Sequence, residues 1–159
     1  MNIKQLVVIA FSSAMLASCG GDTSPKDEAA KHVDKVKTEV IEATPAKVDP
    51  LKDKGVGPIS SITLGEIDPA LAEEGKKIFK DNCKVCHKIK KRYIGPSLAG
   101  VTERRTPEWI MNMIMDPKGM VANNALAKEL LAEYSAPMAN QNMTEDQARA
   151  ILEYFRTHK

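Results

Sequence analysis

The chain has 159 residues, enough for one domain with an extension. Its formal net charge of +2 is too small to indicate nucleic-acid binding by itself. Aromatic residues make up only 4% of the chain, so the polypeptide alone would build a modest core. Three cysteines and three histidines limit the sulfur and imidazole groups available for a metal, a cofactor or a disulfide.

Residues 1–18 have the features of a secretory signal peptide. Lys4 supplies the positive start, and the apolar stretch of 12 residues at positions 6–17 is too short to span a bilayer core of roughly 30 Å. The end of this segment, Leu16-Ala17-Ser18-Cys19, resembles the bacterial lipobox, in which the chain is cleaved before a cysteine that is then acylated. The alternative is an ordinary signal peptide followed by an incidental Cys19. The lipobox predicts an extracytoplasmic protein, lipid-anchored to a bacterial membrane on the periplasmic side.

Residues 19–67 are predicted to be the lipidated N-terminus and a flexible, charged tether. Between residues 20 and 67 there are 7 Lys, 9 Asp or Glu and no aromatic residue. Such a stretch cannot bury enough apolar surface to offset the entropy lost on ordering. The alternative for part of it is a short helix, because valines at positions 33, 36 and 40 fall on one helical face.

One domain is predicted over residues 68–159, and it opens with a helix. Asp68 suits the N-cap position and the proline after it suits the first helical position. Gly75 and Phe79 lie on the mostly apolar face of this helix, which runs to Cys83. A glycine inside a helix costs about 1 kcal/mol relative to alanine, so Gly75 indicates the close approach of another helix.

The helix leads directly into Cys83-Lys84-Val85-Cys86-His87. Two cysteines separated by two residues and followed by histidine are typical of a c-type haem attachment site. Each thiol adds to one haem vinyl group, and the adjacent histidine ligates the iron. A zinc site would need more Cys or His ligands than the chain retains, and a thioredoxin-like redox pair would need a surrounding βαβ pattern that the sequence lacks. We therefore predict one covalently bound haem c per chain.

A basic run follows the haem motif and comprises Lys84, Lys88, Lys90, Lys91 and Arg92. Such a run is either an ordinary solvated surface or a docking ring that raises the on-rate of an acidic partner. Residues 70–159 contain 15 Lys or Arg and 11 Asp or Glu, so the domain as a whole is basic.

The rest of the domain predicts a loop and three further helices. Glycine and proline mark residues 93–101 as a loop. The second helix opens at Thr106-Pro107 and ends near Asp116, because the proline at position 117 disfavours a helical conformation of the residue before it. A third helix is expected over residues 126–134. The last helix begins at Thr144, which forms a capping box with the glutamine three residues later.

On these motifs the chain resembles the class I cytochromes c over roughly residues 69–158. The resemblance rests on CKVCH, GPSLAGV, TPEWI, a Pro-Met loop and a final helix. It implies an all-α fold of about four helices around one covalently bound haem, with the N- and C-terminal helices crossing at Gly75. It also implies that the carbonyl of Pro96 holds the outer ring nitrogen of His87, and that Trp109 lies near a haem propionate.

The sixth iron ligand is sought among the methionines. In the family this methionine lies in the loop before the last helix, which favours Met138 after Pro137. The alternatives are Met143, directly before the Thr144 cap, Met120, in an expected loop, or no methionine at all. The methionines at positions 111, 113 and 115 are expected to pack in the second helix or to be exposed. His/Met ligation raises the reduction potential relative to two histidines and leaves no open position on the iron.

The resemblance implies an electron-transfer protein that is not an enzyme. We expect a monomer that shuttles single electrons between a respiratory quinol-oxidising complex and an extracytoplasmic reductase or oxidase. Its partners are expected to have acidic docking surfaces and to bind through small, weak interfaces. The alternative is a haem enzyme or sensor, peroxidase-like, with a displaceable sixth ligand.

Overall fold

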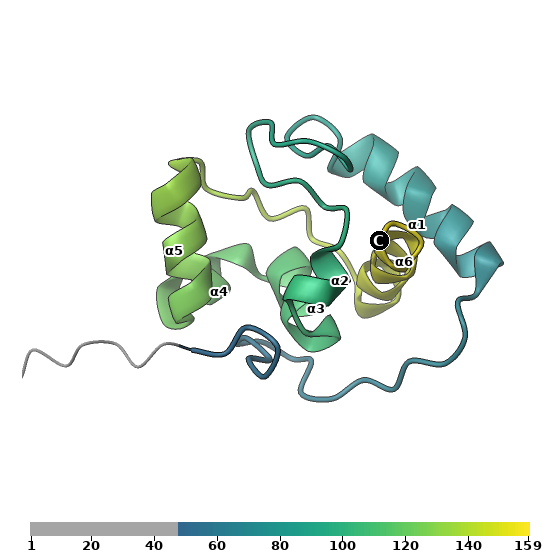
Figure 1. The fold of residues 1–159 in the computed structure, drawn as a ribbon, viewed down its shortest axis with the longest axis horizontal. Coiled ribbons are helices and arrows are strands. Elements are labelled where there is room, and N and C mark those ends of the chain that lie inside the picture. Colours follow the sequence, from purple (N-terminus) through teal and green to yellow (C-terminus); the bar gives the residue numbers. More distant parts are fainter. Residues whose placement is uncertain (1–47) are drawn as a thin grey trace, which may run out of the picture. The chain divides into compact units, whose positions relative to one another are not determined.

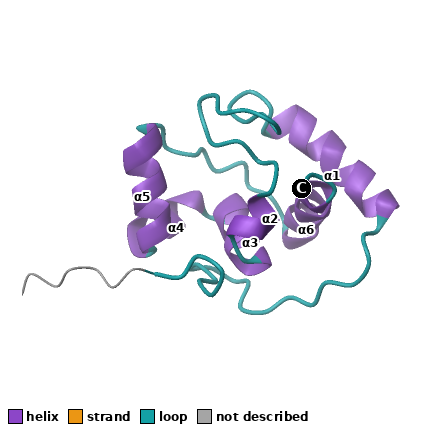
Figure 2. Ribbon diagram, viewed as in Figure 1, coloured by secondary structure: helices purple, strands orange, loops and turns teal. Residues whose placement is uncertain are grey.

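The computed structural model describes residues 48–159, so the expected signal peptide, Cys19 and residues 19–47 of the expected tether lie outside the described part. Residues 48–159 form six helices and no strand (Figures 1 and 2). The helices are α1 (Pro69–Asn82), α2 (Val101–Arg104), α3 (Pro107–Met115), α4 (Pro117–Asn123), α5 (Ala125–Tyr134) and α6 (Glu145–Arg156). This confirms the all-α prediction. Within the same residues, no helix is both long enough and apolar enough to cross a membrane.

The first and last helices, α1 and α6, pack against each other. The Asp68 side chain accepts hydrogen bonds from first-turn amides of α1, and Thr144 forms the predicted capping box at the start of α6. In Figure 1, α6 is seen nearly end-on while α1 lies across the view, so the two helices cross. A Cβ at Gly75 would collide with the backbone carbonyl of Ala150 in α6. The close approach predicted from Gly75 is therefore confirmed.

Glu153 ties α6 to the chain that enters α1. Its side chain is fully buried, pairs with Arg149 and Arg156, and accepts a hydrogen bond of 2.8 Å from the Asp68 amide. Burial acts to raise the pKa of Glu153, but the hydrogen bonds from Arg149, the Asp68 amide and Arg156 outweigh it and hold the pKa below its usual range. The carboxylate therefore stays charged inside the domain.

Helices α3, α4 and α5 follow one another, and each begins at a capping side chain. Thr106 caps α3, Asp116 ends α3 and caps α4, and Asn124 ends α4 and caps α5. Helix α4 occupies a segment expected to be a loop, although its Asp116-Pro117 start repeats the pattern that predicts α1. The single-turn helix α2 is also additional to the predicted set.

Residues 48–67, which we call the strap, run below α4 and α3 in Figure 1 before they reach α1. The strap belongs to the expected flexible tether, and here the structure differs from that expectation. Ile59 is only 5% exposed, and Ile62 and Leu64 are partly buried against the same core. These residues recur at nearly alternate positions and give the strap one apolar side.

The strap is held by side chains from far along the sequence. The buried Asn112 accepts a hydrogen bond from the Ile59 amide at 3.0 Å. It donates to the carbonyls of Ile59 at 2.9 Å and Lys54 at 3.0 Å. The Val56 amide donates to the sulfur of Met120 at 3.0 Å. The composition of residues 20–67 does not indicate this anchoring, because the hydrogen-bond partners of the strap lie in α3 and α4.

Candidate haem site

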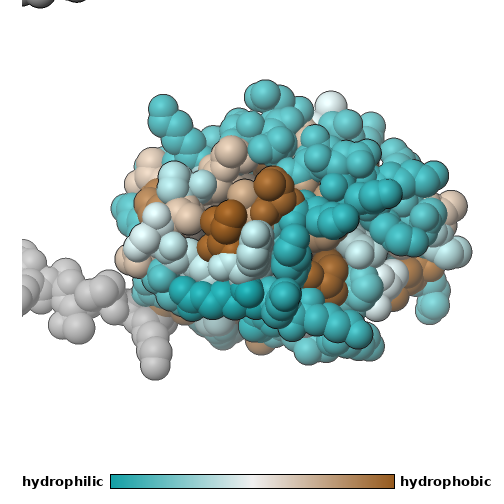
Figure 3. All heavy atoms as spheres, turned by 90° about the horizontal axis from the view of Figure 1, so that it is seen from above, coloured by the Kyte–Doolittle hydropathy of each residue, from teal (hydrophilic) through white to brown (hydrophobic). Residues whose placement is uncertain are grey.

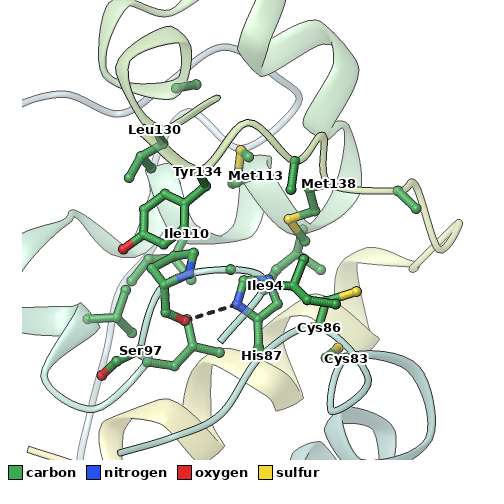
Figure 4. A pocket seen from close by; sticks show the side chains of 18 of the residues that line it. Cys83, Cys86, His87, Ile94, Ser97, Ile110, Met113, Leu130, Tyr134 and Met138 are labelled. Atoms are coloured by element: carbon green, nitrogen blue, oxygen red, sulfur yellow. Dashed lines mark hydrogen bonds between the residues drawn. The ribbon is translucent and has the colours of Figure 1, made fainter. Parts of the chain in front are cut away.

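A cavity opens between the end of α1, the 83–98 segment, helices α3 and α5, and the segment that carries Met138 (Figure 4). Most of its lining is apolar, and includes Ile94, Leu98, Ile110, Ile114, Val121, Leu130, Leu131, Ile151 and Phe155. The structure brings the predicted haem residues of this domain together, because this one cavity is lined by Cys83, Cys86, His87, Pro96 and Met138.

The imidazole of His87 is oriented by the loop that follows it. Its Nδ1 lies 3.1 Å from the carbonyl oxygen of Pro96, which Figure 4 marks with a dashed line. Nδ1 must carry the proton to donate to a carbonyl, so Nε2 keeps its lone pair, and it has no hydrogen-bond partner among the described residues. Burial lowers the pKa of His87, against a smaller opposing effect of the Pro96 carbonyl, so the ring is neutral at pH 7. A neutral imidazole with a free Nε2 is suited to ligate a metal.

Gly95 allows the loop to pack directly against this ring. A Cβ on Gly95 would lie 2.8 Å from Nδ1 of His87, closer than side-chain carbons approach other atoms. The Gly95 amide also donates to the Cys86 carbonyl at 2.9 Å, which ties the loop back to the motif. In this Gly-Pro pair, the glycine provides space for the imidazole and the proline provides its hydrogen-bond acceptor.

The two cysteines lie on a turn that continues α1. The Cys83 amide donates to the Phe79 carbonyl, and the amides of Cys86 and His87 donate to the Cys83 carbonyl. Both cysteines are free thiols in the described chain, and both are partly exposed. Burial, together with the neighbouring Cys86, raises the pKa of the Cys83 thiol to about 11. Redox-active thiols have lowered pKa values, so the Cys83 thiol is poorly suited to thiol–disulfide exchange.

Two methionines reach the cavity. Met138 lines it from the segment before α6, as expected, and Met113 lines it from α3 (Figure 4). Met120 is fully buried beneath the strap, where its sulfur accepts the Val56 amide, and it does not line the cavity. Met143 is partly buried against the core and is likewise absent from the lining. Of the sequence alternatives, only Met138 is therefore placed at the site.

Met113 lines the cavity, although its position in the sequence predicts packing within the second helix or exposure. A clue is available in the spacing, because Ile110, Met113 and Ile114 recur at helical intervals along one face of α3 and all line the cavity. Periodicity alone does not distinguish a face that packs against protein from one that packs against a cofactor.

Arg105 and Trp109 form part of the same wall. Trp109 lines the cavity, but its indole Nε1 donates to Oδ1 of Asn124 at 3.1 Å. The guanidinium carbon of Arg105 lies 5.1 Å from the Trp109 ring centre, and the buried Nε of Arg105 has no hydrogen-bond partner within the described chain. Arg105 therefore offers a cation and a free N–H donor on the wall where the family resemblance implies only Trp109 near a haem propionate.

The 83–98 segment beside the mouth of the cavity carries exposed apolar residues and cations. Val85 is 72% exposed, Tyr93 53% and Ile94 46%. Figure 3 looks onto the upper side of Figure 1, where the 83–98 segment lies, and shows apolar atoms grouped among hydrophilic ones. Part of the basic run is already engaged. Lys88 lies over the Tyr93 ring at 4.7 Å, and Arg92 pairs with Glu133 at 2.7 Å.

These groups fit a c-type haem. The cavity presents two thiols spaced by two residues, a neutral imidazole fixed through its outer nitrogen, a thioether and an apolar wall. The unpartnered Nε of Arg105 adds a donor of the kind that an acidic substituent of the macrocycle needs.

Comparison with known proteins agrees with this fit. The sequence model of the cytochrome c family matches residues 72–159, which is more than half of the chain. The chain belongs to the cytochrome c family. It is 47% identical over 45 residues to a cytochrome c-553-like protein of Synechocystis sp., a match that spans 28% of this chain and 43% of that protein.

Solved structures give the same result. A cytochrome c from Rhodothermus marinus is 45% identical to this chain, with a TM-score of 0.62 over 64% of this chain and 88% of the other. An engineered form of that protein, solved bound to a carbene intermediate, is also 45% identical, with a TM-score of 0.59 over 64% of this chain and 88% of the other.

Membership of this family confirms the predicted cofactor and the resemblance to single-haem class I proteins. Cytochromes c bind haem covalently through a CXXCH motif, which here is formed by Cys83, Cys86 and His87. They are electron-transfer proteins that act with redox partners. The family match begins at residue 72, so the strap lies outside it.

Proposed function

We propose that this cytochrome c carries single electrons between a respiratory quinol-oxidising complex and an extracytoplasmic reductase or oxidase, and that it is not an enzyme. The observation that carries the proposal is the donor set of the cavity. His87 and Met138 together can fill both axial positions of a haem iron, which leaves none for a substrate. In addition, no carboxylate lines the cavity within the described residues, so it provides no acidic side chain for peroxide chemistry.

Each group at the cavity has one task in this proposal. Cys83 and Cys86 hold the haem through thioether bonds, and His87 ligates the iron while Pro96 keeps its ring in one orientation. Met138 would supply the second, thioether ligand of the iron. The haem supplies a one-electron ferric–ferrous couple, with a reduction potential higher than that of a haem ligated by two histidines.

We propose that the partners dock at the cavity mouth and have acidic surfaces. The exposed Val85, Tyr93 and Ile94 provide an apolar contact area. Lys90 and Lys91 lie on the same segment and pair with no carboxylate of the described chain, so they are available to a partner. A small apolar patch beside unpaired cations favours fast, short-lived encounters between a monomer and an acidic protein.

We also propose that acyl chains on Cys19 anchor the protein to a bacterial membrane, on the periplasmic side. The support is the Leu16-Ala17-Ser18-Cys19 sequence and the attachment of c-type haem outside the bacterial cytoplasm. Several acyl chains anchor a protein stably, whereas one binds only marginally. The described strap begins at residue 48, and residues 20–47, which connect it to Cys19, have a fully extended length of roughly 100 Å.

The docking proposal is tested by electron transfer from the reduced holoprotein to two small oxidants, anionic ferricyanide and a cationic cobalt complex, at increasing salt. We expect the rate with the anion to fall with salt and the rate with the cation to rise. The double substitution of Lys90→Gln and Lys91→Gln should weaken both dependences. The control Lys118→Gln, on α4 and away from the 83–98 segment in Figure 1, should not.

Two results would count against the proposal. Salt dependences of the same sign with both oxidants would exclude steering by the basic surface. Rapid consumption of hydrogen peroxide by the holoprotein would favour the enzyme alternative, since it requires access of peroxide to the iron.

A further inference from the structure

The strap reaches the haem site through a continuous chain of hydrogen bonds. Trp109, which is 4% exposed, lines the cavity, and its Nε1 donates to Oδ1 of Asn124 at 3.1 Å. The Nδ2 of Asn124 donates in turn to Oδ2 of Asp53 in the strap, at 2.7 Å. Two hydrogen bonds therefore connect the cavity wall to a residue outside the part of the chain that matches the family.

The side chain of Asn124 can make these contacts in only one orientation. Its Oδ1 also accepts the amide of Ala127 at 3.0 Å, which caps α5, so the oxygen faces two donors. The nitrogen must then face an acceptor. Asp53 supplies that acceptor. If the Asn124 amide were flipped, its oxygen would face the Asp53 carboxylate, which has no hydrogen to donate. Asp53 therefore selects the orientation in which Asn124 holds both Trp109 and the start of α5.

Asp53 is itself fixed in place. Its Oδ1 accepts the Gly55 amide at 2.7 Å, and its main-chain carbonyl accepts the hydroxyl of Thr106 at 2.6 Å. The same Thr106 hydroxyl oxygen accepts the Trp109 amide at 3.1 Å and caps α3. The strap thus contacts the starts of α3 and α5, the two helices that form this side of the cavity.

Asp53 also places a negative charge behind this wall of the cavity. Burial and the adjacent Arg104 lower the pKa of Arg105, and Asp53 is among the groups that oppose this effect. The carboxylate is therefore electrostatically coupled to the one cation that stacks on Trp109. A negative charge on this wall stabilises the more positive, ferric state of a haem bound in the cavity.

We infer that the strap is a working part of the haem site, in which Asp53 positions Trp109 through Asn124 and lowers the reduction potential of the haem. Asp53 touches neither a predicted iron ligand nor the haem motif, so it is a positioning residue. The inference assumes the covalent haem of the family. It rests on the proposed electron-carrier function only in that the reduction potential of the haem then governs electron transfer.

The test compares three substitutions in the full-length holoprotein. Asp53→Asn removes the charge and keeps one acceptor oxygen for Asn124, at the expense of the bond from the Gly55 amide, whereas Asp53→Leu removes the charge and both acceptors. Asp49→Asn is the matched control, because Asp49 lies in the same strap, carries the same charge, and contacts only the neighbouring Leu51 amide and the exposed Lys52 within the described residues. The readouts are the reduction potential and the indole N–H resonance of the ferrous protein, which is unambiguous because Trp109 is the only tryptophan in the chain.

We expect Asp53→Asn to raise the reduction potential with little change in the indole resonance. Asp53→Leu should raise the potential and, by releasing Asn124, make the indole N–H exchange about tenfold faster with solvent. Asp49→Asn should leave the indole exchange unchanged and shift the potential less than Asp53→Asn does, since its charge is exposed and its side chain has no contact with Asn124 or Trp109.

Equal potentials for Asp53→Asn and Asp49→Asn would overturn the electrostatic part of the inference. Wild-type indole exchange in Asp53→Leu would overturn the positioning part, and if that variant does not fold with haem, the potential of Asp53→Asn decides. Neither result affects the proposed function, which fails instead if thioether ligation of the iron is absent.

Discussion

Replacing Asn112 with alanine should release the strap from α3. The Asn112 side chain is 1% exposed and makes three hydrogen bonds to the strap backbone, at the Ile59 amide and at the carbonyls of Ile59 and Lys54. Alanine leaves these three backbone groups without partners. At about 1 kcal/mol for each bond, the expected loss of unfolding free energy is about 3 kcal/mol. In a domain of this size the melting temperature should fall by about 12 °C.

The assay is thermal unfolding of the holoprotein, followed by far-ultraviolet circular dichroism at neutral pH. Asn123→Ala is the control, because Asn123 is exposed and its side chain donates only to the Gly119 carbonyl within α4. Its melting temperature should stay within about 2 °C of the wild type. If Asn112→Ala melts at the same temperature as the control, the strap does not contribute to the folded domain and the reasoning is refuted.

Two further substitutions test the packing of α1 on α6. Gly75→Ala should destabilise the protein by about 2 kcal/mol, despite the better helix propensity of alanine, because the new methyl group meets the backbone carbonyl of Ala150; a denaturant midpoint at or above that of the wild type would contradict this. Glu153→Gln should cost about 3 kcal/mol at neutral pH, since it leaves Arg149 and Arg156 with a buried neutral partner. The pKa of Glu153 is lowered in the folded state, so its contribution is present above the ordinary value of 4.5 and is lost as the pH falls through the lower folded value. The unfolding free energies of the wild type and Glu153→Gln should therefore converge in acid. A difference between them that is the same at pH 3 and pH 7 would show that it does not come from the charge of Glu153.

The parts of the fold that the sequence predicts are those with local causes. Asp68-Pro69 and the Thr144 capping box place the starts of α1 and α6, and the structure has both. Gly75 predicts the approach of another helix because its cost inside a helix needs a reason, and Ala150 supplies it. Helix α4 has the same kind of start, at Asp116-Pro117, so it too has a local cause that the sequence contains.

The strap is different, because its causes are distant in the sequence. Asn112 and Ile59 are 53 positions apart, and neither composition nor periodicity indicates that an asparagine in one helix will pair with the backbone of a preceding segment. A charged, glycine-containing stretch therefore suggests a tether. The polar partners in α3 and α4 can be identified only once the fold has placed them beside the strap.

The haem site shows the same division. The spacing of Cys83, Cys86 and His87 is required by the chemistry of haem attachment, so the sequence alone identifies these residues. The hydrogen bond from His87 to Pro96 follows the family pattern. Met113 reaches the cavity because of how α3 is rotated, and Arg105 because of where the link between α2 and α3 lies, and both depend on packing around the whole domain. Nothing in the residues next to them in the sequence marks either one as a cavity residue.

The optical spectrum of the oxidised holoprotein tests ligation and function together. A thioether bound to ferric haem gives a weak charge-transfer band at the far-red end of the spectrum. We predict this band in the wild type and in the control Met113→Ala, and its loss in Met138→Ala. A wild-type spectrum of five-coordinate, high-spin haem, or a band that survives Met138→Ala and disappears in Met113→Ala, would contradict the proposal that His87 and Met138 hold the iron of an electron carrier.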